Sequence, residues 1–393
     1  MVEIKEVSIL LVGIGGYGST YVRELLSMDQ FSLVKGVVDP NPERSPFYAE
    51  VKKGSIPVFE TVDEFFANHS ADLTIISSPI PYHNEQTLAA LKHDSHVLCE
   101  KPLTTDIEQI YDIIALKNEK KRFVAVGFDW SYSRSIQKLK AEVISGTFGR
   151  PIQFKTLVLW PRDDNYFQRA VWAGKCKTDD GIPIYDSVAN NAAAHFLHNM
   201  FYLLGSTPFE SAHPLKLESE LYRVNPIETF DTCALRVKVE GGTELLYLAT
   251  HAGAEQKGPI YEYVFEDAVI QYERYGSIIV TMRDGTIRRY SDPEEERSQK
   301  LFSCIEAVKT KDYTHVLCGP ESVIPHVMCI DALHTAMNDT IVFPDQSVIR
   351  EDKRRSVKGL DEIMKKSFEL WKLPSELEEA DWAVRGYTSI FSH

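Results

Sequence analysis

The chain has 393 residues, 44% of them hydrophobic and 25% charged, and its formal net charge is -14 at pH 7. This length predicts two domains, and the acidic balance argues against nucleic acid or an anionic membrane as a partner, because phosphate binding needs clustered Lys and Arg. The six cysteines form no Cys-x-x-Cys pair, and we find neither a signal-peptide pattern nor an apolar run near the roughly 20 residues of a membrane span, so we expect reduced thiols and a cytoplasmic protein.

A glycine-rich loop follows the first predicted strand. Residues 7–12 have a buried-strand pattern, and a helical pattern covers residues 17–28. The predicted cofactor-binding residues between them are Gly13, Gly15, Gly16, Tyr17 and Gly18. Gly13 can make the tight turn, Gly15 lets the backbone approach a pyrophosphate, and Gly18 allows close helix packing. Because a helix N-terminus also offers N–H groups to phosphates, the pattern predicts a dinucleotide site.

A second strand, residues 33–38, ends in Asp39, about 20 residues after the last glycine. A carboxylate at this place accepts hydrogen bonds from an adenosine ribose and repels a 2'-phosphate. We therefore expect NAD as the cofactor, with NADP disfavoured; Arg44 is the nearest arginine that follows. The alternative interpretation is that Asp39 is only a turn acid before Pro40.

Strands and helices then alternate through the first third of the chain. Strands are predicted at 73–77, 96–99 and 123–127, and helices at 62–68, 84–92 and 107–118. Alternation of this kind indicates a doubly wound parallel sheet, so we predict an α/β Rossmann domain over residues 1–128. The loop after strand 73–77 supplies the further cofactor-binding candidates Ser77, Ser78, Pro79 and His83. For His83, capping of the next helix is an equally open interpretation.

The strand at 96–99 runs into Glu100, Lys101 and Pro102. Proline cannot donate a ladder hydrogen bond, so the strand must end there. A lysine at the carboxyl end of such a strand projects into the crevice where open α/β sheets bind ligands, on the same sheet edge as the glycine loop. Lys101 is thus a candidate catalytic, cofactor-binding and substrate-binding residue, and Glu100 a cofactor-binding one. The alternative is two solvated charges at a strand exit.

The pattern changes after Gly127. A helix is predicted at 134–145 and a long strand at 152–160, and residues 216–290 have the glycine turns and alternation of an antiparallel sheet, which we expect helices at 296–310, 322–339 and 353–371 to cover. We predict an α+β domain over residues 129–372 with a mostly antiparallel open sheet, followed by an extension at 373–393. Such a sheet commonly associates, so a homodimer or homotetramer through it is expected.

A helix predicted over residues 188–204 carries a polar stripe. At about 100 degrees per residue, Asn191, His195, His198 and Tyr202 share one line, and apolar residues cover the opposite side. The stripe either packs on structural polar groups or lines a cleft that faces the cofactor. A zinc site at His195 and His198 has no evident third ligand beyond Asp186, so we expect no metal.

These features together resemble the Gfo/Idh/MocA oxidoreductase family, whose NAD(P)-dependent members act mostly on sugars and cyclitols. The family pairs its motif lysine with a histidine in a pattern like Asp-x-Gly-x-His-x-x-Asp, matched here by Asn191, Ala193, His195 and His198. The first acid is therefore an amide and the second an imidazole. Where the family has an arginine after the last parallel strand, this chain has Trp130, for which we expect stacking on the cofactor.

The resemblance implies an enzyme that moves hydride between a secondary alcohol of a sugar or polyol and nicotinamide. Lys101 or His195 takes the hydroxyl proton, and Asn191 fixes the hydroxyl. A polar and aromatic substrate pocket is expected from Asp186, Arg162, Trp160, Tyr166 and Trp172, together with His198. The same aromatic residues could instead anchor their loop. Two other functions remain open: an NAD-dependent glycoside hydrolase that works by transient oxidation and elimination, and a cofactor-binding sensor without turnover.

Overall fold

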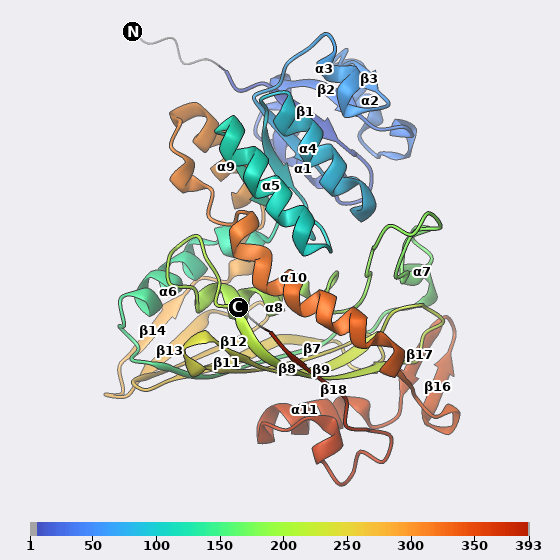
Figure 1. Ribbon diagram of the computed structural model, residues 1–393, viewed down its shortest axis with the longest axis vertical. Helices are drawn as coiled ribbons and strands as arrows, with labels where there is room; N and C mark the ends of the chain where they lie inside the picture. The colour runs from blue at the N-terminus through green and yellow to red at the C-terminus, as the bar shows by residue number, and fades with distance from the viewer. Residues whose placement is uncertain (1–5, 392–393) are drawn as a thin grey trace. The chain divides into compact units, whose positions relative to one another are not determined.

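The computed structural model describes residues 6–391, which form two compact units. The first unit contains the chain up to Tyr132 together with Glu296–Val323, and the second contains Ser133–Glu295 and Ile324–His393. This division differs from the predicted domains, because Glu296–Val323 returns to the first unit and the C-terminal extension belongs to the second. Figure 1 shows the returning segment in orange.

The first unit is built on a six-stranded sheet in the order β3-β2-β1-β4-β5-β6. Its strands, all paired in parallel, are β1 Ile9–Val12, β2 Val34–Val38, β3 Val58–Phe59, β4 Leu73–Ile76, β5 His96–Cys99 and β6 Val124–Val126. Its helices are α1 Gly18–Ser27, α2 Tyr48–Lys53, α3 Val62–Phe66, α4 His83–Lys92, α5 Ile107–Lys120 and α9 Gln299–Thr310. The predicted doubly wound sheet is confirmed, and its strand order reverses between β1 and β4, where such sheets bind ligands.

The second unit holds a ten-stranded sheet whose main path is β14-β13-β12-β11-β7-β10-β9-β8-β15, with β18 also paired to β8. Its strands are β7 Pro151–Leu159, β8 Pro214–Arg223, β9 Thr232–Val239, β10 Glu244–Thr250, β11 Lys257–Phe265, β12 Ala268–Glu273, β13 Ile278–Met282, β14 Ile287–Tyr290, β15 Ile341–Val342 and β18 Tyr387–Ile390. Most pairs are antiparallel, as predicted; β7 with β10 and β8 with β15 are parallel.

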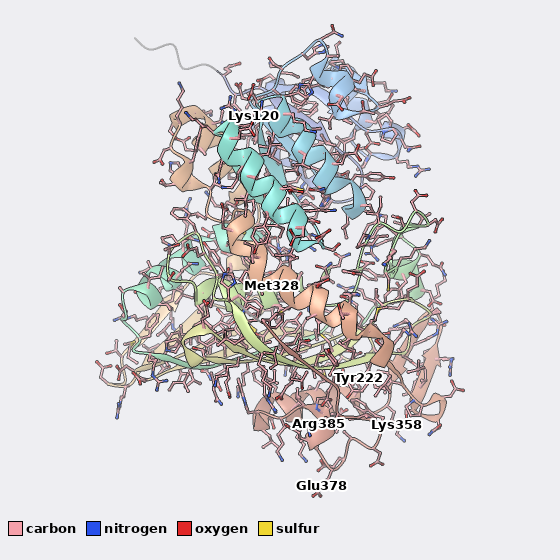
Figure 2. All side chains as sticks on the ribbon, in the orientation of Figure 1. Lys120, Tyr222, Met328, Lys358, Glu378 and Arg385 are labelled. Carbon is pink, nitrogen blue, oxygen red and sulfur yellow. The ribbon has the colours of Figure 1, made fainter. Side chains whose placement is uncertain are left out.

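One apolar cluster joins this sheet to the last helix of the chain. Strand residues such as Leu157 and Tyr222, the latter labelled in Figure 2, pack with Leu360 and Met364 of α11 (Leu360–Leu370). Helices α6 Arg134–Ile144, α7 Asp164–Phe167 and α8 Ala194–Leu203 belong to the same unit, as does a hairpin of β16 Val348–Glu351 with β17 Arg354–Val357. The predicted C-terminal extension adds β18 antiparallel to β8.

Two helices differ from their predicted bounds or place. The segment predicted as a helix over 353–371 is a strand until Val357, and α11 begins only after Gly359, whose φ of +74° suits glycine. Helix α9 packs on β4 and β5 of the first unit rather than on the antiparallel sheet. Helix α10, Pro320–Thr335, begins in the first unit and ends in the second.

One stretch among the described residues, Tyr313–Thr335, is long and apolar enough by length and composition alone to cross a membrane. From the sequence we expected no apolar run of this length. Because 67% of its most apolar window is buried inside the structure, it has the character of a core helix, which passes the same test.

Candidate functional site

The glycine loop after β1 has the backbone geometry that a dinucleotide needs. Gly13 has a φ of +80°, and a Cβ there would lie 2.8 Å from the backbone nitrogen of Ser78. A Cβ on Gly18 would lie 2.1 Å from the carbonyl oxygen of Gly13, so α1 packs directly on the loop. Added Cβ atoms at Gly15 and Gly16 would meet nothing within 4 Å. The loop is thus closed on its protein side and open where a pyrophosphate would lie, which fits NAD.

Asp39 follows β2. Its carboxylate accepts hydrogen bonds from the loop backbone and can still accept others. Its Oδ2 accepts the N–H of Ile14 at 3.0 Å, and its Oδ1 accepts the N–H of Asn41 at 2.9 Å. Each carboxylate oxygen has a further lone pair, and the residue is half-buried. These contacts show that Asp39 closes a turn, and binding of a ribose by its remaining lone pairs stays a prediction.

The segment after β4 is tied to the protein more closely than predicted. The Ser77 hydroxyl donates to the Gly13 carbonyl at 2.9 Å, and the Ser78 hydroxyl donates to Gln86 at 2.5 Å. His83 is 1% exposed, and its Nδ1 and Nε2 lie 2.7 and 2.8 Å from the carbonyl oxygens of Pro102 and Ser78. Both ring nitrogens are occupied by backbone, so His83 joins the strand exits of β4 and β5 rather than reaching a cofactor. Pro79 precedes a short 3-10 turn, Ile80–Tyr82.

The Glu-Lys-Pro motif stands directly after β5, as predicted. Lys101 is half-buried, whereas Glu100 is only 7% exposed and lies in an ion pair with Lys300 of α9. The Glu100 carboxylate, which we had predicted to bind the cofactor, is thus bound by protein groups instead. Lys300 was missed because it is distant in the sequence. A signal existed: Lys300 shares the buried side of α9 with Cys304 and Ala307, at helical spacings of four and seven.

Trp130 lies in a short 3-10 helix, Asp129–Tyr132, and is 2% exposed. The hydroxyl of the neighbouring Tyr132 donates to the Cys318 carbonyl at 3.0 Å, which ties this turn to the returning segment of the same unit. The expected stacking of Trp130 on the cofactor stays a prediction.

In the second unit, the predicted helix over 188–204 begins later than expected. Helix α8 starts at Ala194, so Asn191 lies in the turn before it and not on a helical stripe with His195. The reason is local hydrogen bonding: the Asn190 amide donates to the Tyr185 carbonyl at 3.1 Å, and the Asn191 amide donates to the Asp186 carboxylate. These contacts compete with helical backbone geometry.

The two histidines of α8 have different surroundings. Every residue of this helix except His195 is buried, so His195 is the one accessible position along it. His198 is 1% exposed; burial, followed by the neighbouring His326 and Lys140, holds its pKa well below the usual value. Tyr202 accepts a hydrogen bond from Gln137 and donates one to the Pro208 carbonyl. This burial gives His198 a packing position within the second unit in place of the predicted contact with substrate.

Asp186 is the centre of a network that holds the predicted substrate loop. Its carboxylate accepts two bonds from Arg169, at 3.1 and 3.2 Å, and the N–H of Gly174 at 2.6 Å, besides the Asn191 amide. Since it is 6% exposed, it orients these groups rather than facing a ligand. Cations stack on the loop aromatics: Arg169 on Tyr166 and Trp172, and Arg162 on Trp160 and Tyr166.

Each unit therefore gathers part of the predicted site. The first unit brings the glycine loop, Asp39, residues 77–79 and Lys101 to the carboxyl ends of its strands, and the second brings Asn191, Asp186 and the Arg162 loop together. The pairing of Lys101 with His195 stays a prediction. In the described part of the chain, no group of three or more His, Cys, Asp and Glu is arranged to hold a metal ion.

Comparison with known proteins agrees with this geometry. Residues 7–128 match the family model described as "Oxidoreductase family, NAD-binding Rossmann fold". Inositol 2-dehydrogenase 1 of Mycolicibacterium vanbaalenii is 30% identical over 150 residues, 38% of this chain and 43% of the relative, and inositol 2-dehydrogenase of Rhodococcus jostii is 30% identical over 147 residues, 37% and 40%. The matched region thus spans less than half the length of these relatives.

Solved structures share the fold over most of the chain. WlbA dehydrogenase of Bordetella pertussis, solved with NADH and UDP-GlcNAcA, has a TM-score of 0.69 at 16% identity and covers 85% of this chain and 97% of its own. UDP-N-acetylglucosamine 3-dehydrogenase GnnA of Acidithiobacillus ferrooxidans has a TM-score of 0.66 at 17% identity, covering 86% and 98%. The match over residues 7–128 confirms the predicted resemblance to the Gfo/Idh/MocA oxidoreductase family for this part of the chain, an NAD-binding Rossmann domain.

Proposed function

We propose that the protein is an NAD-dependent dehydrogenase that oxidises a secondary alcohol of a sugar or polyol. The observation that carries this proposal is the placement of Lys101 at the carboxyl end of β5, two strands from the glycine loop after β1, on a sheet of the NAD-binding family. The inositol and nucleotide-sugar dehydrogenases among its relatives and neighbours support this class of substrate.

The residues of this chain would divide the reaction as follows. Gly13, Gly15 and Gly16 would hold the pyrophosphate of NAD and Asp39 its ribose; bound NAD supplies the acceptor for the hydride that leaves the carbinol carbon. Lys101 takes the proton of the substrate hydroxyl as general base. We assign His195 as the second proton-handling group and Asn191 as the residue that orients the hydroxyl, supported by the accessibility of His195 on α8 and the bond that fixes Asn191.

The substrate loop favours a polyhydroxylated ligand. Tyr166 and Trp172 offer flat apolar faces for sugar C–H groups. Arg162, which donates to the Pro161 carbonyl at 3.2 Å, adds a cation beside them. We also propose that the protein forms a homodimer or homotetramer through the outer strands of its second sheet, where Ile287 of β14 is 58% exposed. Light scattering after size exclusion measures that mass.

The proposed function is tested by incubating the purified protein with NAD or NADP and a panel of free sugars, cyclitols, sugar acids and aryl glycosides. NADH absorbance from a free sugar or cyclitol, with NAD preferred over NADP, supports the proposal. Release of an aglycone without net NADH overturns it in favour of hydrolysis. NAD binding without turnover on any member of a panel that includes inositols and sugar nucleotides counts against an enzyme of this class.

A further inference from the structure

The first unit buries an ion pair that joins its two sequence motifs. Lys300 is 2% exposed, and its Nζ lies 2.5 Å from Oε1 of Glu100. The same Nζ lies 3.2 Å from the hydroxyl of Tyr17 and 3.2 Å from the carbonyl oxygen of Gly127. These three acceptors match the three hydrogens of an ammonium group, so the lysine has a complete set of partners.

Glu100 is held from several sides besides Lys300. Its Oε1 accepts the Tyr21 hydroxyl at 2.6 Å, and its Oε2 accepts the backbone N–H of Lys101 at 3.3 Å. A Cβ on Gly127 would lie 2.7 Å from Oε2, so the carboxylate fills the space that a side chain would take. These contacts fix the position of the Glu100 side chain. Lys101 is joined to Glu100 both by the peptide bond and by a hydrogen bond.

The charge of Lys300 depends on its acidic neighbours. Burial alone lowers the pKa of Lys300, but the Glu100 carboxylate, with Tyr17 and Asp129, outweighs burial and raises that pKa above its usual value. Burial raises the pKa of Tyr17 to about 12, so its hydroxyl stays protonated at neutral pH. A buried carboxylate without this cation would keep its desolvation penalty uncompensated.

We propose that Lys300 is a positioning residue for the dehydrogenation: it fixes Glu100, and through Glu100 the backbone of Lys101, and it holds the Tyr17 hydroxyl of the glycine loop. The inference rests on the proposed function, because it concerns the catalytic base and the dinucleotide loop. One ammonium group from α9 thus fixes the positions of both the cofactor loop after β1 and the base after β5.

The test separates positioning from mere stability. Lys300→Met leaves Glu100 buried and unpaired, and we expect the Tm to fall by roughly 10 °C. The double variant Glu100→Gln with Lys300→Met removes the unpaired charge, so its Tm should return to near the wild-type value. We expect its kcat to stay about 100-fold low, because the base is no longer held, and its Kd for NAD, measured by calorimetry, to rise about 10-fold.

Tyr17→Phe gives a third measurement that does not depend on the buried pair surviving. It removes only the hydroxyl that Lys300 contacts and should weaken NAD binding several-fold at unchanged Tm. The matched control is Lys117→Met, which breaks the 2.8 Å ion pair of Lys117 with Glu321 between the same two segments of the first unit. Its NAD affinity and kcat should equal those of the wild type.

Two results would overturn the proposal. One is a double variant that folds and has wild-type kcat and NAD affinity, which would make the pair a stability element only. The other is Tyr17→Phe with wild-type NAD affinity, which would remove the link to the glycine loop. Failure of the proposed function looks different: the wild type would then bind NAD and show no turnover on the panel, while the NAD affinities of the variants would still report on Lys300.

Discussion

Both units bury imidazoles, among them His83 and His96 in the first, but the polar groups beside their candidate site residues differ. The first unit buries a charged pair, Lys300 with Glu100, beside its sequence motifs. The second buries imidazoles that burial holds neutral: the pKa of His251 and of His334 is lowered to about 3, and that of His198 lies well below its usual value. The raised pKa of Lys300 keeps its ammonium group charged as the pH changes, whereas a buried histidine with a lowered pKa stays neutral only until the pH falls to that pKa.

This difference bears on how each unit serves the proposed reaction. The cofactor side is fixed by charges that compensate one another within the first unit, so we expect little tolerance for substitution there. The substrate side is fixed by Asp186, which has several donors, and by cations that stack on aromatic rings. Because the network has several donors, we expect the loss of one donor to weaken it without disrupting it.

The largest expected effect comes from removing the base that the first unit positions. Lys101→Met should lower kcat by about 1000-fold, because general-base catalysis is lost, while the calorimetric Kd for NAD stays the same. The control is Lys35→Met on β2, whose ammonium bonds only the nearby Ser32 carbonyl among the contacts described. Near wild-type turnover by Lys101→Met would show that the base is another residue.

The pH dependence of stability should report the neutral buried state of His334 in the second unit. Because the folded-state pKa of His334 is about 3 and the unfolded value about 6.5, the unfolded chain binds more protons between these values. The stability that the neutral His334 contributes is therefore present above pH 6.5 and is lost as the pH falls towards 3. Replacing His334 by Phe, which keeps a ring against Tyr185, should reduce the loss of unfolding free energy between pH 7 and pH 5 by about 2 kcal/mol.

Urea unfolding at the two pH values measures this difference. A His334→Phe variant with the same pH dependence as the wild type would contradict the neutral buried state of that histidine.

Sequence patterns correctly predicted the elements whose structure depends on a few neighbouring residues. Strand β5 was predicted with its observed bounds, since an apolar run and Pro102 define both its content and its end. The glycine loop was predicted because its conformation needs glycine at Gly13 and Gly18. Both features are settled within a few residues of the chain.

The features that we did not predict from the sequence depend on residues that are distant in the chain. Lys300 and Glu100 are 200 positions apart, and a lysine in a helix pattern gives no sign of which acid it meets. The early start predicted for α8 failed because Asp186 draws the Asn191 amide away from helical geometry. The buried His198 was placed in the site because helical spacing shows which residues share a face, but not what covers that face.

The smallest effect should come from the redundant network of the second unit. Arg169→Met leaves Asp186 with the Gly174 N–H and the Asn191 amide, and the Arg169 side chain is already 27% exposed, so we expect a loss of only about 1–2 kcal/mol of unfolding free energy. The substrate KM should rise about 5-fold, since the cation that stacks on Tyr166 and Trp172 is gone, with the Kd for NAD unchanged. If Arg169→Met instead lost as much stability and turnover as Lys300→Met, the network around Asp186 would depend on one cation as strongly as the buried pair of the first unit does.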